Sequence, residues 1–144
     1  FLPSEILAAF LWAQLEAVDS LIVRRLEIWN QYHTAFAELE AQGKVRRPII
    51  PNHCEHNAHI YYLLMPNIQL RTQFIHKLRQ GGINPIFHYI PLHSSPAGLK
   101  FGRTDGDLLL TEEISERLVR LPLWVDMTDD IVQRVIDMTY EALT

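Results

Sequence analysis

Residues 3–43 read PSEILAAFLWAQLEAVDSLIVRRLEIWNQYHTAFAELEAQG and carry one long helical pattern. The side chains of one face recur at steps of three and four residues, which is the spacing of an α-helix. Ser4 is placed to cap the start of this helix, and Gly43 is placed to end it. The positions that share the face are Leu7, Leu11, Leu15, Val18, Ile22, Leu26, Trp29, His33 and Phe36.

The length of this helix is itself informative. At 1.5 Å per residue, a straight helix of about 38 residues is ~57 Å long, whereas a compact domain of this size has a radius of gyration of about 15 Å. The helix therefore either bends near Ala17–Ser20 or extends beyond its own domain toward another body of protein. Because the pattern also begins close to Phe1 without an initiator Met, we expect the chain to be part of a longer protein.

The rest of the chain alternates between strand and helix patterns, which favours an α+β fold with helices on a small sheet. We predict a central strand from the apolar run AHIYYLLM, residues 58–65, and a Pro- and Gly-rich loop at 92–107. The further predicted elements are an extended segment at 44–56, a helix at 67–82, a strand at 83–91, and helices at 111–121 and 128–143, the last two capped by Thr111 and Thr128.

The composition excludes several classes of partner. The chain has 144 residues, 48% of them hydrophobic, and a formal net charge of -4, so nothing in it attracts nucleic acid or an anionic membrane. The uncharged apolar stretch from Ile6 to Leu15 is about ten residues, whereas a bilayer span needs roughly 20. Cys54 is the one cysteine, so no disulfide forms within the chain, and we expect a reducing, cytoplasmic location.

Four potential metal ligands, His53, Cys54, His56 and His59, lie close together ahead of the predicted central strand. Structural zinc usually takes ligands from two separate short motifs, whereas these four belong to one segment. In an extended chain, neighbouring side chains also point in opposite directions. We therefore favour a polar turn that leads into the strand, with His59 half-buried and no metal. A metal site completed by His88 and His93 is the alternative.

The stretch FHYIPLHSSPAG, residues 87–98, is the strongest candidate for a binding site. His88, Tyr89 and His93 lie where a predicted strand runs into a loop, and binding groups concentrate on loops carried by a rigid scaffold. Their side chains can hydrogen-bond to sugar hydroxyls or phosphates and can stack on rings. The alternative is that Tyr89 and His93 only cap the edge of the core. The acidic and basic residues of 112–120 read as a solvated helix face with ion pairs at i,i+4.

Several segments, in the same order, resemble the DegT/DnrJ/EryC1/StrS sugar aminotransferase family. The resemblance runs from Phe1 to about Leu143. Its motifs are Ser4-Glu5, Ala8-Ala9 and Gln14-Leu15 in the first helix, then NAHIYYLL, LRQGGI, FHYIPLHSSPAG and SERLVRLPLW.

This resemblance implies a fold. The chain would be the small C-terminal domain of a fold-type I aminotransferase that depends on pyridoxal 5′-phosphate. Residues 1–42 would form the long helix that links it to a large domain, and residues 43–144 a small, mainly antiparallel sheet packed with helices. His59 would belong to the small-domain fold, with no metal.

The resemblance also implies an activity for the intact protein. Such enzymes are homodimers or higher homo-oligomers that transfer an amino group, usually from glutamate, to a nucleotide-linked keto-sugar. Here the substrate would be a dTDP-4-keto-6-deoxyhexose used in polysaccharide antigen synthesis. His88, Tyr89 and His93 match the family's substrate loop, so we expect them to contact the sugar nucleotide.

The same resemblance places the catalytic lysine elsewhere. None of Lys44, Lys77 and Lys100 matches the Schiff-base motif of the family. We therefore expect no catalytic or cofactor-binding residue, no bound cofactor and no activity in this chain by itself. The alternative from another class is a stand-alone α+β module that binds a ligand or a protein partner.

Overall fold

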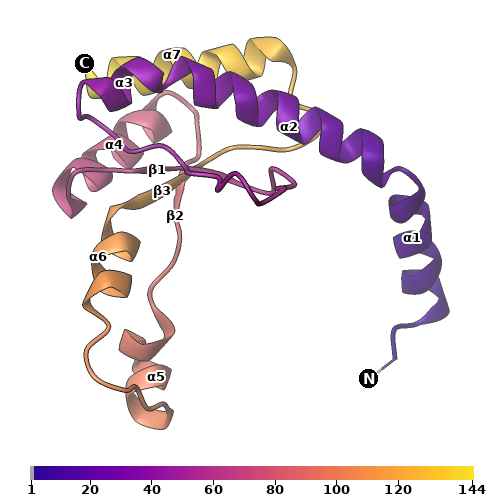
Figure 1. Ribbon diagram of the computed structural model, residues 1–144, viewed down its shortest axis with the longest axis horizontal. Helices are drawn as coiled ribbons and strands as arrows, with labels where there is room; N and C mark the ends of the chain where they lie inside the picture. Colours follow the sequence, from indigo (N-terminus) through magenta and orange to yellow (C-terminus); the bar gives the residue numbers. More distant parts are fainter. Residues whose placement is uncertain (1) are drawn as a thin grey trace.

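The computed structural model describes residues 2–144. It contains seven α-helices, one 3-10 helix and three short strands (Figure 1). The α-helices are α1 (Glu5–Glu16), α2 (Val18–Ala35), α3 (Ala37–Ala41), α4 (Ile68–Gln80), α5 (Pro96–Phe101), α6 (Leu109–Arg117) and α7 (Asp129–Leu143). The strands are β1 (Tyr61–Leu64), β2 (Ile86–Phe87) and β3 (Leu118–Leu121), and the 3-10 helix η1 is Leu92–Ser94.

The long N-terminal helical pattern is divided into three helices. α1 and α2 meet at Ala17 with a bend of 61°, so the first of the two sequence alternatives, a bent helix, is correct. The Ser4 hydroxyl accepts a hydrogen bond from the Leu7 amide at 3.3 Å, which confirms the predicted cap. Gly43 follows α3 with φ +71°, a conformation that favours glycine at the end of a helix.

The three strands form one antiparallel sheet in the order β1-β3-β2. Tyr61 lies opposite Leu121, and Ile86 lies opposite Arg120. Arg46, in the segment predicted to be extended, forms a single bridge with Leu64 on the outer side of β1. The helices pack on this small sheet, so the predicted α+β class is confirmed.

Two predictions about the sheet are wrong. Residues 118–121 were predicted to end a helix capped by Thr111, but α6 begins at Leu109 and gives way at Leu118 to β3. β3 is the central strand, in place of the predicted 58–65 segment, because it hydrogen-bonds to a strand on either side. Its side chains alternate in burial, with Val119 and Leu121 inside, whereas Leu118 and Leu121 are three positions apart and also fit a helix.

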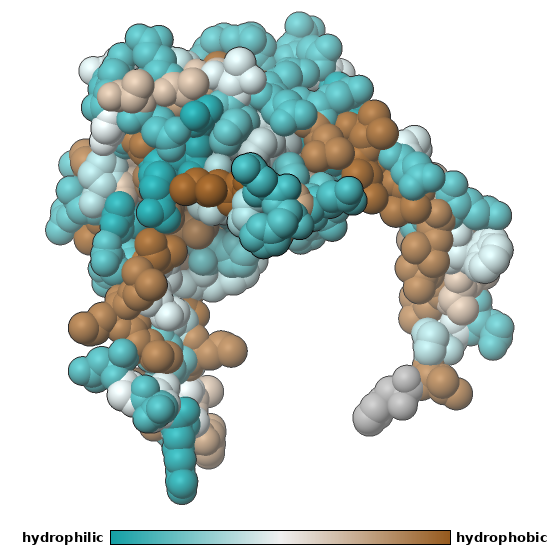
Figure 2. Space-filling model, in the orientation of Figure 1, coloured by the Kyte–Doolittle hydropathy of each residue, from teal (hydrophilic) through white to brown (hydrophobic). Residues whose placement is uncertain are grey.

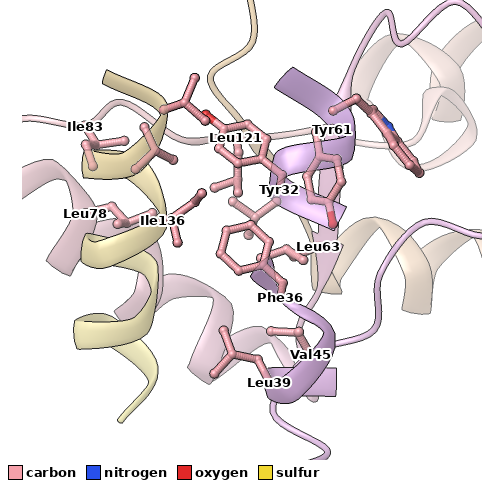
Figure 3. Close-up of a cluster of buried hydrophobic side chains, with 14 of the residues drawn as sticks. Tyr32, Phe36, Leu39, Val45, Tyr61, Leu63, Leu78, Ile83, Leu121 and Ile136 are labelled. Carbon is pink, nitrogen blue, oxygen red and sulfur yellow. The ribbon is translucent and has the colours of Figure 1, made fainter. Parts of the chain in front are cut away.

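The hydrophobic core lies between the sheet and the helices α2, α3, α4 and α7 (Figure 3). Tyr32 and Phe36 come from the first helical region, and their rings lie against Tyr61 of β1 at 5.3 and 6.0 Å between centroids. Leu78 of α4 and Ile136 of α7 approach from the opposite side. Residues before and after position 42 therefore share one core.

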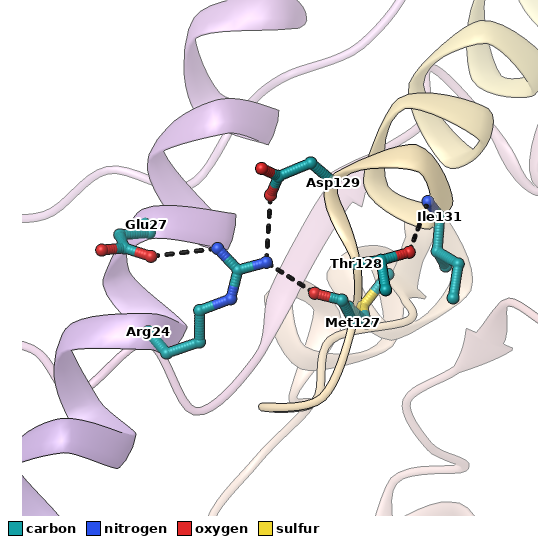
Figure 4. A network of polar contacts seen from close by, with 6 residues as sticks. All are labelled: Arg24, Glu27, Met127, Thr128, Asp129 and Ile131. Carbon is teal, nitrogen blue, oxygen red and sulfur yellow. Dashed lines mark hydrogen bonds and ion pairs between the residues drawn. The ribbon is translucent and has the colours of Figure 1, made fainter.

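Polar contacts hold α2 against α7. Arg24 donates hydrogen bonds to the Asp129 carboxylate at 3.0 Å and to the Met127 carbonyl, and it also pairs with Glu27 (Figure 4). Nearer the end of α7, the Tyr140 hydroxyl donates to the Ala35 carbonyl at 2.6 Å.

α1 differs from the other long helices because it buries none of its residues. It extends from one end of the domain and the α5–α6 stretch extends from the other, so the molecule has the outline of an arch (Figure 1). The side of α1 that faces the space under the arch is hydrophobic (Figure 2). Ile6, Leu7 and Phe10 of α1 are 82%, 62% and 67% exposed. Among residues 2–144 no single helix is long and apolar enough to cross a membrane. α1 and α2 have the required length and apolarity only when taken together, and the pair is bent.

Candidate functional site

The three predicted site residues follow β2, where the chain leaves the sheet. His88 is half-buried at the end of β2, and Tyr89 is 57% exposed. Their rings meet edge to face, with centroids 4.4 Å apart and planes at 74°. The peptide bond between them is cis. The side chains of His88 and Tyr89 therefore pack together at the point where the chain leaves β2.

His93 follows in the 3-10 helix η1. Its Nε2 atom is 2.8 Å from a carboxylate oxygen of Glu112 on α6, and the His93 side chain is 20% exposed. A carboxylate only accepts hydrogen bonds, so this contact places a proton on Nε2 and leaves Nδ1 of the neutral ring as an acceptor.

His88 and His93 line two different hollows on either side of the first turns of α6. The smaller, about 370 Å³, is formed by His88 with α6 residues that include Thr111 and Ile114. The larger, about 720 Å³, is formed by His93 with Arg103 and the α5 segment. Tyr89 lines neither hollow. The structure thus places His88 and His93 beside α6 without joining them in one pocket, leaves Tyr89 in contact with His88 alone, and the substrate role of all three stays a prediction.

The electrostatics of His88 suit a neutral hydrogen-bonding group. Burial lowers the pKa of His88 below its ordinary value of 6.5, and the nearby charges of Arg120 and His59 lower this pKa further. His88 is therefore neutral near pH 7, where it can donate one hydrogen bond and accept another.

Sequence reasoning missed Glu112, Arg103 and Thr104. Glu112 was interpreted as part of a solvated helix face, but it is half-buried and pairs with His93. Arg103 and Thr104 lie in the predicted loop, which contains the unpredicted helix α5 and lines the larger hollow. No periodicity marks these contacts, because they join separate segments.

The histidine-rich turn ahead of β1 is built differently from the prediction. His59 is exposed, so its predicted half-burial is wrong. His56 is the half-buried member, with its ring 4.6 Å from that of Trp29 and its Nδ1 accepting from the Ala58 amide at 3.3 Å. His53 and Cys54 are exposed, and within residues 2–144 no three His, Cys, Asp or Glu side chains are placed to hold a metal ion.

The three lysines of the chain do not line the hollows at His88 and His93. A Schiff base to pyridoxal phosphate needs a lysine amine beside the substrate, and the expected absence of that lysine from this chain stays a prediction. The Lys77 amine donates to the Ala142 carbonyl at 2.9 Å, and the Lys100 amine lies 5.0 Å from the centre of the Phe101 ring. Lys44 lines a separate hollow with Lys77.

Comparison with known proteins identifies relatives of the whole chain. Residues 4–139 match the model of the DegT/DnrJ/EryC1/StrS aminotransferase family. The uncharacterized protein MJ1066 of Methanocaldococcus jannaschii is 37% identical over 86% of the chain, and the spore coat polysaccharide biosynthesis protein SpsC of Bacillus subtilis is 30% identical over 86%. The dTDP-3-amino-3,4,6-trideoxy-alpha-D-glucose transaminase of Micromonospora megalomicea is 24% identical over 97%.

The chain spans about a third of the length of these relatives, at 32% of MJ1066, 32% of SpsC and 37% of the Micromonospora transaminase. The chain also matches about a third of the length of similar proteins whose structures are solved. DesV of S. venezuelae superposes with a TM-score of 0.83 at 25% identity, covering 93% of this chain and 35% of its own. The pyridoxal phosphate form of the putative sugar aminotransferase Spr1654 of Streptococcus pneumoniae has a TM-score of 0.72 at 23% identity, covering 92% and 35%.

Proposed function

We propose that this chain, which belongs to the DegT/DnrJ/EryC1/StrS aminotransferase family, forms the small C-terminal domain of a nucleotide-sugar aminotransferase. Its α+β fold and its match to about a third of each longer relative support this assignment. In this proposal, residues 1–42 link the small domain, residues 43–144, to a large domain.

The proposed reaction moves an amino group from glutamate to a dTDP-4-keto-6-deoxyhexose. The motifs of the chain resemble in detail those of dTDP-4-amino-4,6-dideoxygalactose transaminase, and the Micromonospora relative is named for a dTDP-amino sugar. The name of SpsC supports a role in making polysaccharide. The proposed enzyme is a cytoplasmic homodimer or higher homo-oligomer.

One observation carries the proposal: two residues of the stretch that resembles the family's substrate loop meet the same helix, because His88 shares a hollow with Thr111 and Ile114 of α6 and His93 pairs with Glu112 of α6. Neutral His88 is suited to hydrogen-bond a sugar hydroxyl, and the exposed ring of Tyr89 offers an apolar face to a sugar or a base. His93 is held by Glu112 with its Nδ1 as an acceptor.

The chemistry is divided between this domain and the rest of the enzyme. Pyridoxal phosphate, when bound, supplies the electron sink for transamination, and its lysine comes from outside residues 1–144 in this proposal. The residues of this chain bind and orient the sugar nucleotide. Correct placement of a substrate contributes to the rate as directly as the reacting groups do.

The exposed face of α1 supports the same arrangement. Monomeric proteins rarely leave a contiguous apolar surface of this kind uncovered. In the proposed enzyme, Ile6, Leu7 and Phe10 pack against the large domain.

The substrate role is tested in the full-length protein with His88→Ala and His93→Ala. Each substitution removes a hydrogen bond worth about 1–1.5 kcal/mol, so KM for the sugar nucleotide should rise roughly tenfold. His53→Ala, which changes an exposed histidine outside the site, should leave KM unchanged. Unaltered KM in both site variants would remove the role assigned to these histidines.

A further inference from the structure

The stretch that carries Tyr89 and His93 extends away from the sheet (Figure 1). Its hydrogen bonds are almost all internal, such as those from the Ser95 amide to the Pro91 carbonyl and from the Gly98 amide to the Ser95 hydroxyl. Among the hydrogen bonds and ion pairs within residues 2–144, the pair between His93 and Glu112 is the one that joins residues 89–107 to another element. The contact between His93 and Glu112 is therefore the polar link between this stretch and α6.

The stretch behaves as a unit because η1 and α5 pack tightly. A Cβ atom on Gly98 would lie 1.7 Å from the Leu92 carbonyl oxygen and 3.1 Å from the Cα of His93. The backbones of η1 and α5 are thus in direct contact at Gly98, where a side chain would clash. A displacement of His93 necessarily displaces α5, and with it one wall of the larger hollow.

α6, in contrast, is fixed to the core. Arg71 of α4 donates to the Ser115 carbonyl at 3.1 Å, and Arg117 donates to the Met65 carbonyl at 2.8 Å. The last residue of α6 is followed directly by β3, the central strand. Glu112 therefore belongs to a helix that is hydrogen-bonded to the core. Its contact with His93 is the one hydrogen bond or ion pair that links residues 89–107 to another element within residues 2–144.

We propose that Glu112 is a positioning residue of the site: its carboxylate holds the His93 imidazole, and through it the unit of η1 and α5, against α6. Glu112 also fixes the proton of His93 on Nε2, so that Nδ1 is the atom left to accept a hydrogen bond from a ligand hydroxyl. The effect on substrate binding rests on the proposed function, whereas the structural effect does not.

The structural effect is tested by hydrogen exchange on the full-length protein with Glu112→Ala and Glu112→Gln. A half-buried hydrogen bond between an imidazole N–H and a carboxylate shifts a local opening equilibrium by about two- to fivefold. Amides of residues 91–102 should therefore exchange about two- to fivefold faster in Glu112→Ala, with α7 unchanged. Glu116→Gln is the matched control, because Glu116 is an exposed glutamate of the same helix. Equal exchange in Glu112→Ala and the control, or equal acceleration in α7, would overturn the proposal.

The effect on the histidine is read from the ¹⁵N shifts of its ring. In the parent protein, Nε2 should be the protonated nitrogen of neutral His93, and Glu112→Ala should mix the two tautomers. A ring that stays wholly in the Nε2–H form in Glu112→Ala would contradict the positioning role.

Kinetics separate this proposal from the proposed function. If both hold, Glu112→Ala raises KM for the sugar nucleotide about two- to fivefold with kcat retained, and Glu112→Gln recovers part of the loss. If exchange and tautomer respond while KM is unchanged in both Glu112→Ala and His93→Ala, Glu112 positions His93 but the substrate role of His93 is wrong.

Discussion

Arg24 on α2 donates a hydrogen bond to the carboxylate of Asp129, 105 positions later, at 3.0 Å. Asp129 begins α7, so this contact joins the N-terminal helical region to the last helix of the domain (Figure 4). The contact lies on the surface, and further along α2 the buried side chains of Ile28, Trp29 and Tyr32 enter the core. α1, on the far side of the bend at Ala17, has no such tie and leaves its apolar face exposed.

The first prediction concerns the titration of Asp129. The hydrogen bond from Arg24, followed by that from Gln31 and the charge of Arg24, lowers the pKa of Asp129 below its ordinary 3.8. A carboxyl group whose pKa is lower in the folded protein than in the unfolded chain stabilises the fold at pH values above its pKa in the unfolded chain. This stability is lost as the pH falls through the pKa in the folded protein. Carboxyl ¹³C NMR should show a midpoint below 3.8 that rises in Arg24→Gln. Arg134→Gln is the control, and an equal midpoint in the parent and Arg24→Gln would contradict the assignment.

The second prediction compares two buried tyrosines. Tyr32 donates its hydroxyl proton to the Pro122 carbonyl at 3.0 Å, whereas the buried hydroxyl of Tyr61 has no hydrogen-bond partner among the described residues. Tyr32→Phe should lower the free energy of unfolding by about 1 kcal/mol, whereas Tyr61→Phe removes an unpaired buried hydroxyl and should leave the free energy of unfolding unchanged or raise it by about 1 kcal/mol. Urea denaturation of the two variants measures the difference. An equal loss in both would show that the Tyr61 hydroxyl is bonded after all.

The third prediction concerns acid sensitivity at His33. Burial lowers the pKa of His33 below 6.5, and the Arg47 and His56 charges lower it further, although Glu40 acts in the opposite direction. The unfolded chain therefore takes up a proton more readily than the folded protein, and stability falls as pH drops below 6.5.

Urea denaturation at several pH values from about 7.5 to about 5.5 tests this slope. His33→Phe keeps a ring against Trp29, whose centroid is 4.5 Å away, and should lose less stability over that range than the parent protein. His53→Gln removes an exposed histidine and should keep the parent slope. A parent slope that persists in His33→Phe would assign the acid sensitivity to another group.

The fourth prediction separates the stretch at 89–107 from the core. Gly98→Ala places a methyl group against the Leu92 carbonyl, so η1 and α5 must move apart. Limited proteolysis within residues 92–102 should become faster, while the Tm of the domain is unchanged, because none of these residues is buried in the core. Gly106→Ala, at φ +72° with open space around it, changes backbone preference without this clash. A lowered Tm in Gly98→Ala would show that the stretch supports the core.

The sequence predicted those features that depend on local periodicity and capping. The caps at Ser4 and Thr128 and the helix at 68–80 follow from spacing and from side-chain oxygens that accept from free amides, whereas the bend near Ala17 was one of two alternatives that the helix length left open. β3 was missed because Leu118 and Leu121 fit a helix as well as a strand, and pairing with two other strands decides between them.

The site was predicted less fully than the fold. His88, Tyr89 and His93 were named from their residue types and from the family resemblance. The contact between His93 and Glu112 joins a loop to a helix that follows it, and no local pattern encodes such a contact. His56, and not His59, packs on Trp29, and Ala58 between the two histidines has φ +50°, so the segment is not the regularly extended chain that the sequence predicted.

The central claim is that this domain serves an aminotransferase whose reactive lysine lies outside residues 1–144. The most direct measurement follows nitrogen from ¹⁵N-labelled glutamate to a dTDP-4-keto-6-deoxyhexose in the presence of pyridoxal phosphate. The account predicts that the full-length protein transfers the label and that the polypeptide of residues 1–144 alone transfers none. Transfer by residues 1–144 alone, or no transfer by the full-length protein, would contradict it.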